Sequence, residues 1–167
     1  MNVAEVLDDA FGRLPDLIRA AVEGLTDEQL RWAPADGANP IGWLVWHLTR
    51  VQDHHVADVL DADQVYLSGD WARRFGRDPD PSDIGYGHSP ADVAAVRPES
   101  GQALIDYYTA VGDRTREFLR TLTTDDLDRV VDESWDPPVT LGVRLLSVLN
   151  DDTQHAGQAA YVRGLLR

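Results

Sequence analysis

Four stretches of the chain carry apolar residues at the three- and four-residue spacing of a helix, and this pattern constrains the fold most. They lie at residues 3–24, 40–60 and 99–121, and from residue 140 to near the C-terminus. No set of strands emerges from the remaining sequence. We therefore predict an all-α four-helix bundle, built as one domain over residues 1–167.

Capping residues and prolines mark the helix boundaries. Thr26 and Gln29 have the spacing of a capping box, which opens a short helical turn after the first long helix. Asn39 is a favoured N-cap and Pro40 is favoured at the first helical position, so the second long helix is expected to begin there. Pro15 is expected to kink or split the first helix, because it cannot donate a backbone hydrogen bond.

The connection between the second and third long helices is a long crossover. Gly, Pro, Asp and Ser punctuate residues 61–98, where short helical segments are expected only at residues 71–75 and 90–95. Loops of this length in a compact domain are usually functional or disordered. Aromatic residues in the stretch favour an ordered loop that packs over another part of the molecule: Tyr66, Trp71, Phe75 and Tyr86.

The charge and hydropathy of the chain argue against two classes of partner. Its 29 acidic and 15 basic residues give a formal net charge of −14, which repels a nucleic-acid backbone. No run approaches the ~20 apolar residues of a membrane span, and the N-terminus lacks the pattern of a signal peptide. We therefore expect a cytoplasmic protein with no nucleic acid and no membrane as partner.

Two residue types are missing from the sequence, and each absence excludes a class of chemistry. All 15 basic residues are arginine, so no lysine is available to form a Schiff base. The absence of cysteine excludes disulfides, cysteine-ligated zinc and a cysteine nucleophile. Any thiol chemistry would use a thiol that a substrate or cofactor brings.

Three polar residues on apolar helix faces form a candidate metal site. His47 lies in the most apolar run of the sequence, between Trp46 and Leu48. Asp151 and His155 are four residues apart in the last helix, so their side chains project side by side. Helical bundles build metal sites from such a couple and a ligand on a facing helix. The alternative is that these histidines only form hydrogen bonds in the core.

Two imidazoles and one carboxylate suit several divalent metals. Zinc, iron, nickel and manganese all accept this set of ligands. Three protein ligands also leave coordination positions open for water or a substrate.

The same two helices resemble motifs of the DinB-like superfamily. The second reads Trp43-Leu44-Val45-Trp46-His47-Leu48, which resembles the family signature Trp-x-x-x-His-Leu. Residues 151–158 read Asp-Asp-Thr-Gln-His-Ala-Gly-Gln, similar to the family motif of a His or Glu, three spacers, a His and a later Gly-Gln pair. The helix order and the long second crossover extend the resemblance over nearly the whole chain.

The resemblance implies that His47, Asp151 and His155 are the metal ligands. At the position of Asp151 most relatives have His, and the mycothiol-dependent maleylpyruvate isomerases have Glu. Aspartate is one methylene shorter than glutamate, which favours weaker binding or binding through a water. Asp152, three residues before His155, is an alternative ligand, although the register of the Gly-Gln pair favours Asp151.

A second polar cluster lies further along the same helix, at Asp53, His54, His55 and Asp58. We expect these residues to be solvated or to face a loop, with a role near a substrate as the alternative. His54 would lie about 10 Å along the helix axis from His47, which is too far to share one metal.

The long crossover contains further polar candidates. His88 is expected to be an exposed turn residue, or alternatively to fold over the site. Arg73, Arg74 and Arg77 would either receive a carboxylate substrate or pair with nearby acids.

Members of the DinB-like superfamily include metal-dependent thiol S-transferases and isomerases that use thiols such as mycothiol or bacillithiol. By this resemblance we expect a thiol S-transferase for a small-molecule substrate, with a divalent metal, zinc first, that lowers the pKa of a coordinated thiol. One alternative is a hydrolase with a metal-activated water. The other is a non-catalytic, stress-related binding protein. Relatives often dimerise through helices, which makes a homodimer a candidate assembly.

Overall fold

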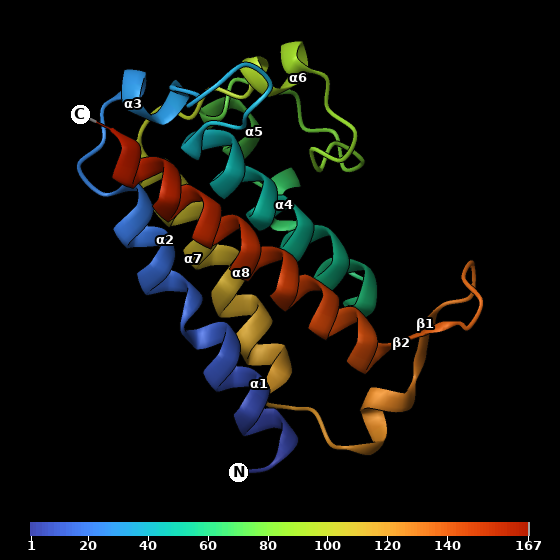
Figure 1. The fold of residues 1–167 in the computed structure, drawn as a ribbon. Coiled ribbons are helices and arrows are strands. Elements are labelled where there is room, and N and C mark those ends of the chain that lie inside the picture. The colour runs from blue at the N-terminus through green and yellow to red at the C-terminus, as the bar shows by residue number, and fades with distance from the viewer. Residues whose placement is uncertain (167) are drawn as a thin grey trace.

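Four long helical rods pack side by side in the computed structural model, which describes residues 1–166 (Figure 1). The first rod consists of α1 (Val3–Gly12) and α2 (Leu14–Val22), and the second is α4 (Ile41–Leu60). The third and fourth are α7 (Gly101–Leu119) and α8 (Leu141–Leu165). This arrangement confirms the predicted all-α four-helix bundle.

The helix boundaries follow the capping residues closely. The first rod is split just before Pro15, which occupies the first turn of α2. Thr26 and Gln29 form the predicted capping box at the start of α3 (Asp27–Arg31), with reciprocal hydrogen bonds of 3.2 and 3.0 Å. α4 begins one residue later than predicted, because Pro40 is the N-cap residue and remains extended.

The long crossover between α4 and α7 is ordered and contains three short helices. These are η1 (Val65–Leu67), α5 (Trp71–Arg74) and α6 (Pro90–Ala95), so the two predicted helical segments are confirmed. Tyr66 and Phe75 are buried, which ties the crossover to the core as their aromatic side chains indicated.

α4 is the central helix of the bundle. Every residue from Ile41 to Asp53 is buried, and α4 packs more extensively against α8 than any other pair of helices does. All four rods contribute to one core, with Phe11, Ile18, Trp46, Tyr107, Leu145 and Val148 among its buried side chains. None of the helices within residues 1–166 has both the length and the apolar character needed to span a bilayer.

A short hairpin precedes α8 and was not predicted. It pairs β1 (Val130–Asp132) with β2 (Val139–Thr140) in antiparallel fashion, after η2 (Asp125–Asp128). Arg144 ties it to α8 through an ion pair with Asp132 of 2.8 Å. Strands of three and two residues are too short to show an alternating pattern.

Candidate metal centre

The side chains of His47, Asp151 and His155 meet between α4 and α8. Each offers one ligand atom, and these three atoms all lie within 4.8 Å of one another. His47 is 6% exposed, and the other two are partly buried. The structure therefore brings together the three residues that the helix spacing placed on facing helices.

Hydrogen bonds on the outer side of each imidazole decide which nitrogen faces the cluster. Nδ1 of His47 lies 2.5 Å from the carbonyl oxygen of Ile84, and Nδ1 of His155 lies 2.8 Å from Oε1 of Gln158. These oxygens only accept, so both Nδ1 atoms carry the proton and both Nε2 atoms keep a free lone pair. Gln158, from the Gly-Gln pair, thus orients one candidate ligand.

Burial and the neighbouring carboxylate shift the pKa values of the two histidines in opposite directions. Burial lowers the pKa of His47, which favours the neutral, metal-binding form of the imidazole. Asp151 raises the pKa of His155, because a protonated Nε2 would donate a hydrogen bond to Oδ1 of that carboxylate, 3.5 Å away, whereas in the neutral ring Nε2 carries the lone pair. The other oxygen, Oδ2 of Asp151, is buried without a hydrogen-bond partner among the described residues.

These groups fit a divalent ion. A zinc ion about 2.1 Å from each ligand atom requires separations of at most about 4.2 Å, which small side-chain rotations can reach. The unpartnered oxygen of Asp151 and the two free Nε2 atoms supply lone pairs that the protein itself does not use.

Asp152 lies outside this cluster. Its side chain is fully buried, neither carboxylate oxygen has a hydrogen-bond partner in the described part of the chain, and Tyr108 lies nearby. Burial, followed by the charge of Asp151, raises the pKa of Asp152 well above its ordinary value. Of the two adjacent acids, Asp151 is therefore the one available to the site.

The loop before α6 packs over the site, where His88 contacts Trp43, the α4 side chain that stacks on His47. Trp43 stacks on His47 with ring centroids 4.5 Å apart, and its Nε1 donates to Nδ1 of His88 at 3.1 Å. Nε2 of His88 in turn donates to Asp83 at 2.8 Å. His88 thus folds over the site, which was the alternative expectation, rather than lying in an exposed turn.

Gly85 lets this loop approach the site closely. A Cβ atom at this position would lie 2.6 Å from Nδ1 of His47, and 3.1 and 3.0 Å from the rings of Trp43 and Trp46. Its φ of +90° also favours glycine. Any side chain here would displace the Ile84 carbonyl from His47.

A cleft of about 210 Å³ opens beside the cluster. His47, Val51 and His55 line it from α4, and Ser147, Val148 and Asp151 line it from α8, with Ile84 and Tyr86 from the loop. His55 therefore reaches the same cleft as two candidate ligands. The sequence indicated this only as the alternative of a role near a substrate, because the partner that holds His55 lies far along the chain, in α8.

His55 is held as a neutral imidazole. Burial lowers its pKa to about 4, with a further contribution from the charge of Arg144. Nη1 of Arg144 lies 3.2 Å from Nδ1 of His55, and a guanidinium only donates, so Nδ1 accepts and the proton is on Nε2.

Of the rest of the second polar cluster, Asp53 and His54 face the crossover, whereas Asp58 is exposed, as expected for a solvated residue. Asp53 is 1% exposed and accepts hydrogen bonds from the amides of Val65 and Tyr66 and from the hydroxyl of Tyr107. His54 contacts Gln64 through Nδ1, at 3.1 Å. The loop-facing expectation holds for Asp53 and His54, whereas solvation is wrong for Asp53.

The three arginines of the crossover pair with acids. Arg73 bonds Asp70, Arg74 bonds Glu99 and Asp106, and Arg77 bonds Asp83. The pairing alternative therefore describes them, and none is a free cation beside the cleft.

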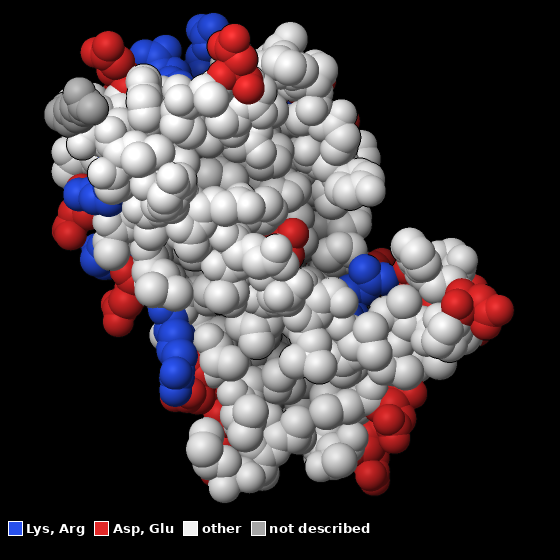
Figure 2. Space-filling view, viewed as in Figure 1, with Lys and Arg blue, Asp and Glu red and all other residues white. Residues whose placement is uncertain are grey.

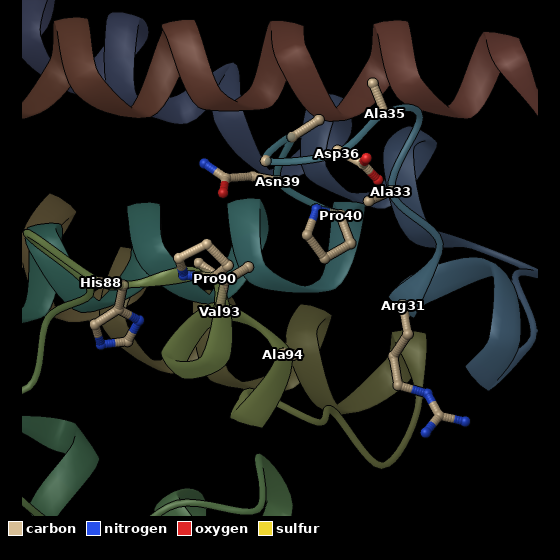
Figure 3. A pocket seen from close by; sticks show the side chains of 12 residues that line it. Arg31, Ala33, Ala35, Asp36, Asn39, Pro40, His88, Pro90, Val93 and Ala94 are labelled. Atoms are coloured by element: carbon tan, nitrogen blue, oxygen red, sulfur yellow. The ribbon is translucent and has the colours of Figure 1, made fainter.

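A second hollow, of about 370 Å³, lies at the N-terminal end of α4 (Figure 3). Small side chains such as Pro40, Val93 and Ala94 line it, with His88 at one side and Arg31 at the other. None of the three candidate ligands lines it, so the cleft beside Asp151 is the cavity that serves the site.

Comparison with known proteins places the chain in a family. The family model described as DinB superfamily matches residues 10–159. The chain belongs to the DinB superfamily. Membership agrees with the resemblance that the two helix motifs carry.

A solved structure supports the same placement. The chain is similar to a structure described as the crystal structure of the conserved protein of locus from Enterococcus faecalis, with 30% sequence identity. The match covers 98% of this chain and 96% of that one, with a TM-score of 0.89. That description names no activity, and a comparison with curated proteins finds no match.

Proposed function

We propose that His47, Asp151 and His155 bind a divalent metal, zinc first, and that the protein is a metal-dependent thiol S-transferase for a small-molecule substrate. The observation that carries the proposal is the convergence of one ligand atom from each of these three side chains, all within 4.8 Å of one another, beside a buried carboxylate oxygen of Asp151 that has no hydrogen-bond partner among the described residues. The thiol would be a low-molecular-weight compound such as mycothiol, because the chain has no cysteine of its own.

The residues of the site have separate tasks in this proposal. When bound, the metal would lower the pKa of a coordinated thiol, so that thiolate forms at neutral pH. Ile84 and Gln158 fix the orientation of the two imidazoles through their Nδ1 atoms. Val51 and Val148 give the cleft apolar walls, which exclude water from the substrate.

Metal content tests the site directly. We expect about one equivalent of zinc per chain after loading, lost in His47→Ala, His155→Ala and Asp151→Asn. His54→Ala and Asp152→Asn are matched controls, since one lies on the same helix outside the cluster and the other is adjacent to Asp151, and both should keep the metal. A protein that binds none of zinc, nickel, iron or manganese would refute the site and leave the non-catalytic interpretation.

Thiol dependence tests the reaction. A transferase requires an added thiol for turnover of an electrophilic substrate, and substrate loss should match thiol consumption. Turnover that proceeds equally without thiol would replace the proposal with the metal-dependent hydrolase.

We propose in addition that the protein forms a homodimer through the exposed face of α8. Within α8, all of whose residues the structure describes, no exposed side chain is charged, and Val143, Leu146 and Tyr161 are among the most exposed. Figure 2 shows this broad uncharged face, with charged groups mainly at its margins. Two chains of net charge −14 would repel each other least at such a face.

Sedimentation equilibrium tests the dimer. Leu146→Glu should shift the native dimer to monomer, because it buries a carboxylate in the apolar interface. Trp135→Glu, an equally exposed residue in the hairpin, should leave the dimer intact. A native protein that is monomeric at 100-micromolar concentrations would exclude this assembly.

A further inference from the structure

His55 lines the candidate metal cleft without belonging to the metal cluster. It lies eight residues after His47 on α4, about 12 Å along the helix axis, and within residues 1–166 the group of close ligand atoms consists of His47, Asp151 and His155. His55 and the cluster are therefore the two polar ends of one cleft. The walls between them include Val51 and Val148.

The imidazole of His55 is fixed from behind. Arg144 donates to Nδ1 of His55 through Nη1 at 3.2 Å and to Asp132 through Nη2 at 2.8 Å. α8 and the hairpin thus hold one nitrogen of the ring. The remaining Nε2–H donor has no partner among the hydrogen bonds of the described residues.

Arg144 places a guanidinium beside His55 at this end of the cleft, where it also pairs with Asp132. Nε of Arg144 is buried and has no acceptor within the described part of the chain. A donor backed by a cation binds an anionic oxygen more tightly than a neutral one. The metal end, by contrast, already holds the carboxylate of Asp151.

The size of the cleft limits what reaches both ends. A volume of about 210 Å³ lies below the range of about 300–1,000 Å³ typical of small-molecule pockets, so the cleft suits a small ligand. A ligand of this size that reaches the metal cluster also comes close to His55.

We propose that His55 is a specificity-determining residue whose Nε2–H binds a carboxylate oxygen of the substrate, at the end of the cleft away from the metal. This inference rests on the proposed function and narrows it. The substrate class is a small carboxylic acid that places its reacting end at the metal cluster. Arg144 is a positioning residue that occupies Nδ1 of His55 and so keeps the proton on Nε2.

Short thiols of matched length test the proposal in the cobalt-loaded protein. The affinities of 3-mercaptopropionate and 1-butanethiol are measured from the sulfur-to-cobalt absorption band, and the ratio of the two affinities is compared between proteins. We expect His55→Phe and His55→Leu each to lower the ratio of the 3-mercaptopropionate affinity to the 1-butanethiol affinity about ten-fold relative to the native protein. Loss of one charge-assisted hydrogen bond implies a change of this size.

The neighbouring histidine provides the matched control. His54→Phe changes a residue that contacts Gln64 and does not line the cleft, so the ratio should stay at its native value. The neutral 3-mercaptopropionamide should lose less than three-fold affinity in His55→Phe. If the amide lost as much affinity as the carboxylate, the Nε2–H donor of His55 would bind any carbonyl oxygen. That result would overturn the proposed preference for a carboxylate.

Nitrogen-15 NMR of the metal-free protein supplies a readout independent of thiols. The tautomer with the proton on Nε2 is expected for His55, and Arg144→Met should mix the two tautomers. A predominant Nδ1–H tautomer in the native protein overturns the inference, as does an unchanged affinity ratio in His55→Phe. Absence of the absorption band from the native cobalt protein would instead refute the proposed thiol function, and this inference with it.

Discussion

At the scale of single residues, the candidate site depends on a position that has no side chain. Gly85 combines a φ of +90° with a close approach to Nδ1 of His47. We expect Gly85→Ala to lower zinc affinity about 10- to 100-fold, because the added Cβ displaces the Ile84 carbonyl that orients His47. Competition with a chromophoric chelator measures the affinity.

Gly87 is the matched control for this substitution. It has a similar φ of +74°, but a Cβ there would meet no atom within 4 Å. Gly87→Ala should therefore lose stability through backbone strain, about 1–3 kcal/mol, while zinc affinity stays near native. Equal losses of affinity in the two variants would show that loop strain, and not contact with His47, controls the site.

Local spacing predicted part of the candidate site and missed the rest. His47 stood out in an apolar run, and Asp151 and His155 are one turn apart, so three residues were recognisable without a structure. His55 was named only with a role near a substrate as the alternative, because its partner Arg144 is 89 residues away. The burial of Asp53 was missed for the same reason, since its partners are amides of the crossover and a tyrosine of α7.

At the scale of elements, one buried arginine fastens the crossover to the bundle. Arg50 is fully buried and donates to the carbonyl oxygens of Asp80, Pro81 and Asp83. Arg50→Met should lower the free energy of unfolding by about 3–5 kcal/mol, because it strands loop carbonyls and removes a cation beside Asp53. Hydrogen exchange in residues 80–88 should accelerate at the same time.

The control for Arg50→Met is an exposed arginine of the same crossover. Arg73 pairs only with Asp70 at the surface, so Arg73→Met should change the free energy of unfolding by less than about 0.5 kcal/mol. If exchange in residues 80–88 stayed native in Arg50→Met, the crossover would be held by its aromatic residues instead.

An ion pair between helices gives the fold a defined pH dependence. Asp8 of α1 accepts from Nε of Arg116 on α7 at 2.6 Å, and this hydrogen bond lowers the pKa of Asp8. The pKa of Asp8 is lower in the folded state than in the unfolded state. The ion pair therefore contributes its full stabilisation at pH values above the unfolded-state pKa, and this stabilisation is lost as the pH falls through the folded-state pKa. Asp8→Asn should therefore cost about 1 kcal/mol at pH 7 and almost nothing near pH 2.

Urea unfolding at several pH values measures this difference. Asp9→Asn is the control, because Asp9 pairs with Arg13 at the exposed end of the same helix and joins no second helix. A difference between native protein and Asp8→Asn that persists unchanged to pH 2 would contradict the ion-pair explanation.

The elements themselves differ in how far the sequence determines them. Long helices repeat their apolar spacing over many residues, and local caps such as Thr26 fix their ends, so the four rods were predictable. The hairpin before α8 was not, because its register depends on packing against the rest of the molecule. The start of α4 was predicted one residue too early, because proline is accepted both as an N-cap and as the first helical residue, and Pro40 is the N-cap.

At the scale of the whole molecule, the candidate metal centre joins the two helices that pack most extensively, α4 and α8. One core links all four rods, so we expect a single cooperative unfolding transition. Zinc that binds only the folded state should raise the free energy of unfolding by about 2.7 kcal/mol at a free concentration of 100 times Kd. For a chain of this size that corresponds to a rise in Tm of about 5–10 °C.

Calorimetry with and without zinc checks this prediction, with His155→Ala as the comparison. The variant keeps the core but loses one candidate ligand, so zinc should leave its Tm unchanged. An equal rise in both proteins would place the stabilising zinc elsewhere, for example on the acidic surface that the net charge of −14 provides. Two resolved transitions in the zinc-free protein would show that the four rods do not unfold as one cooperative unit.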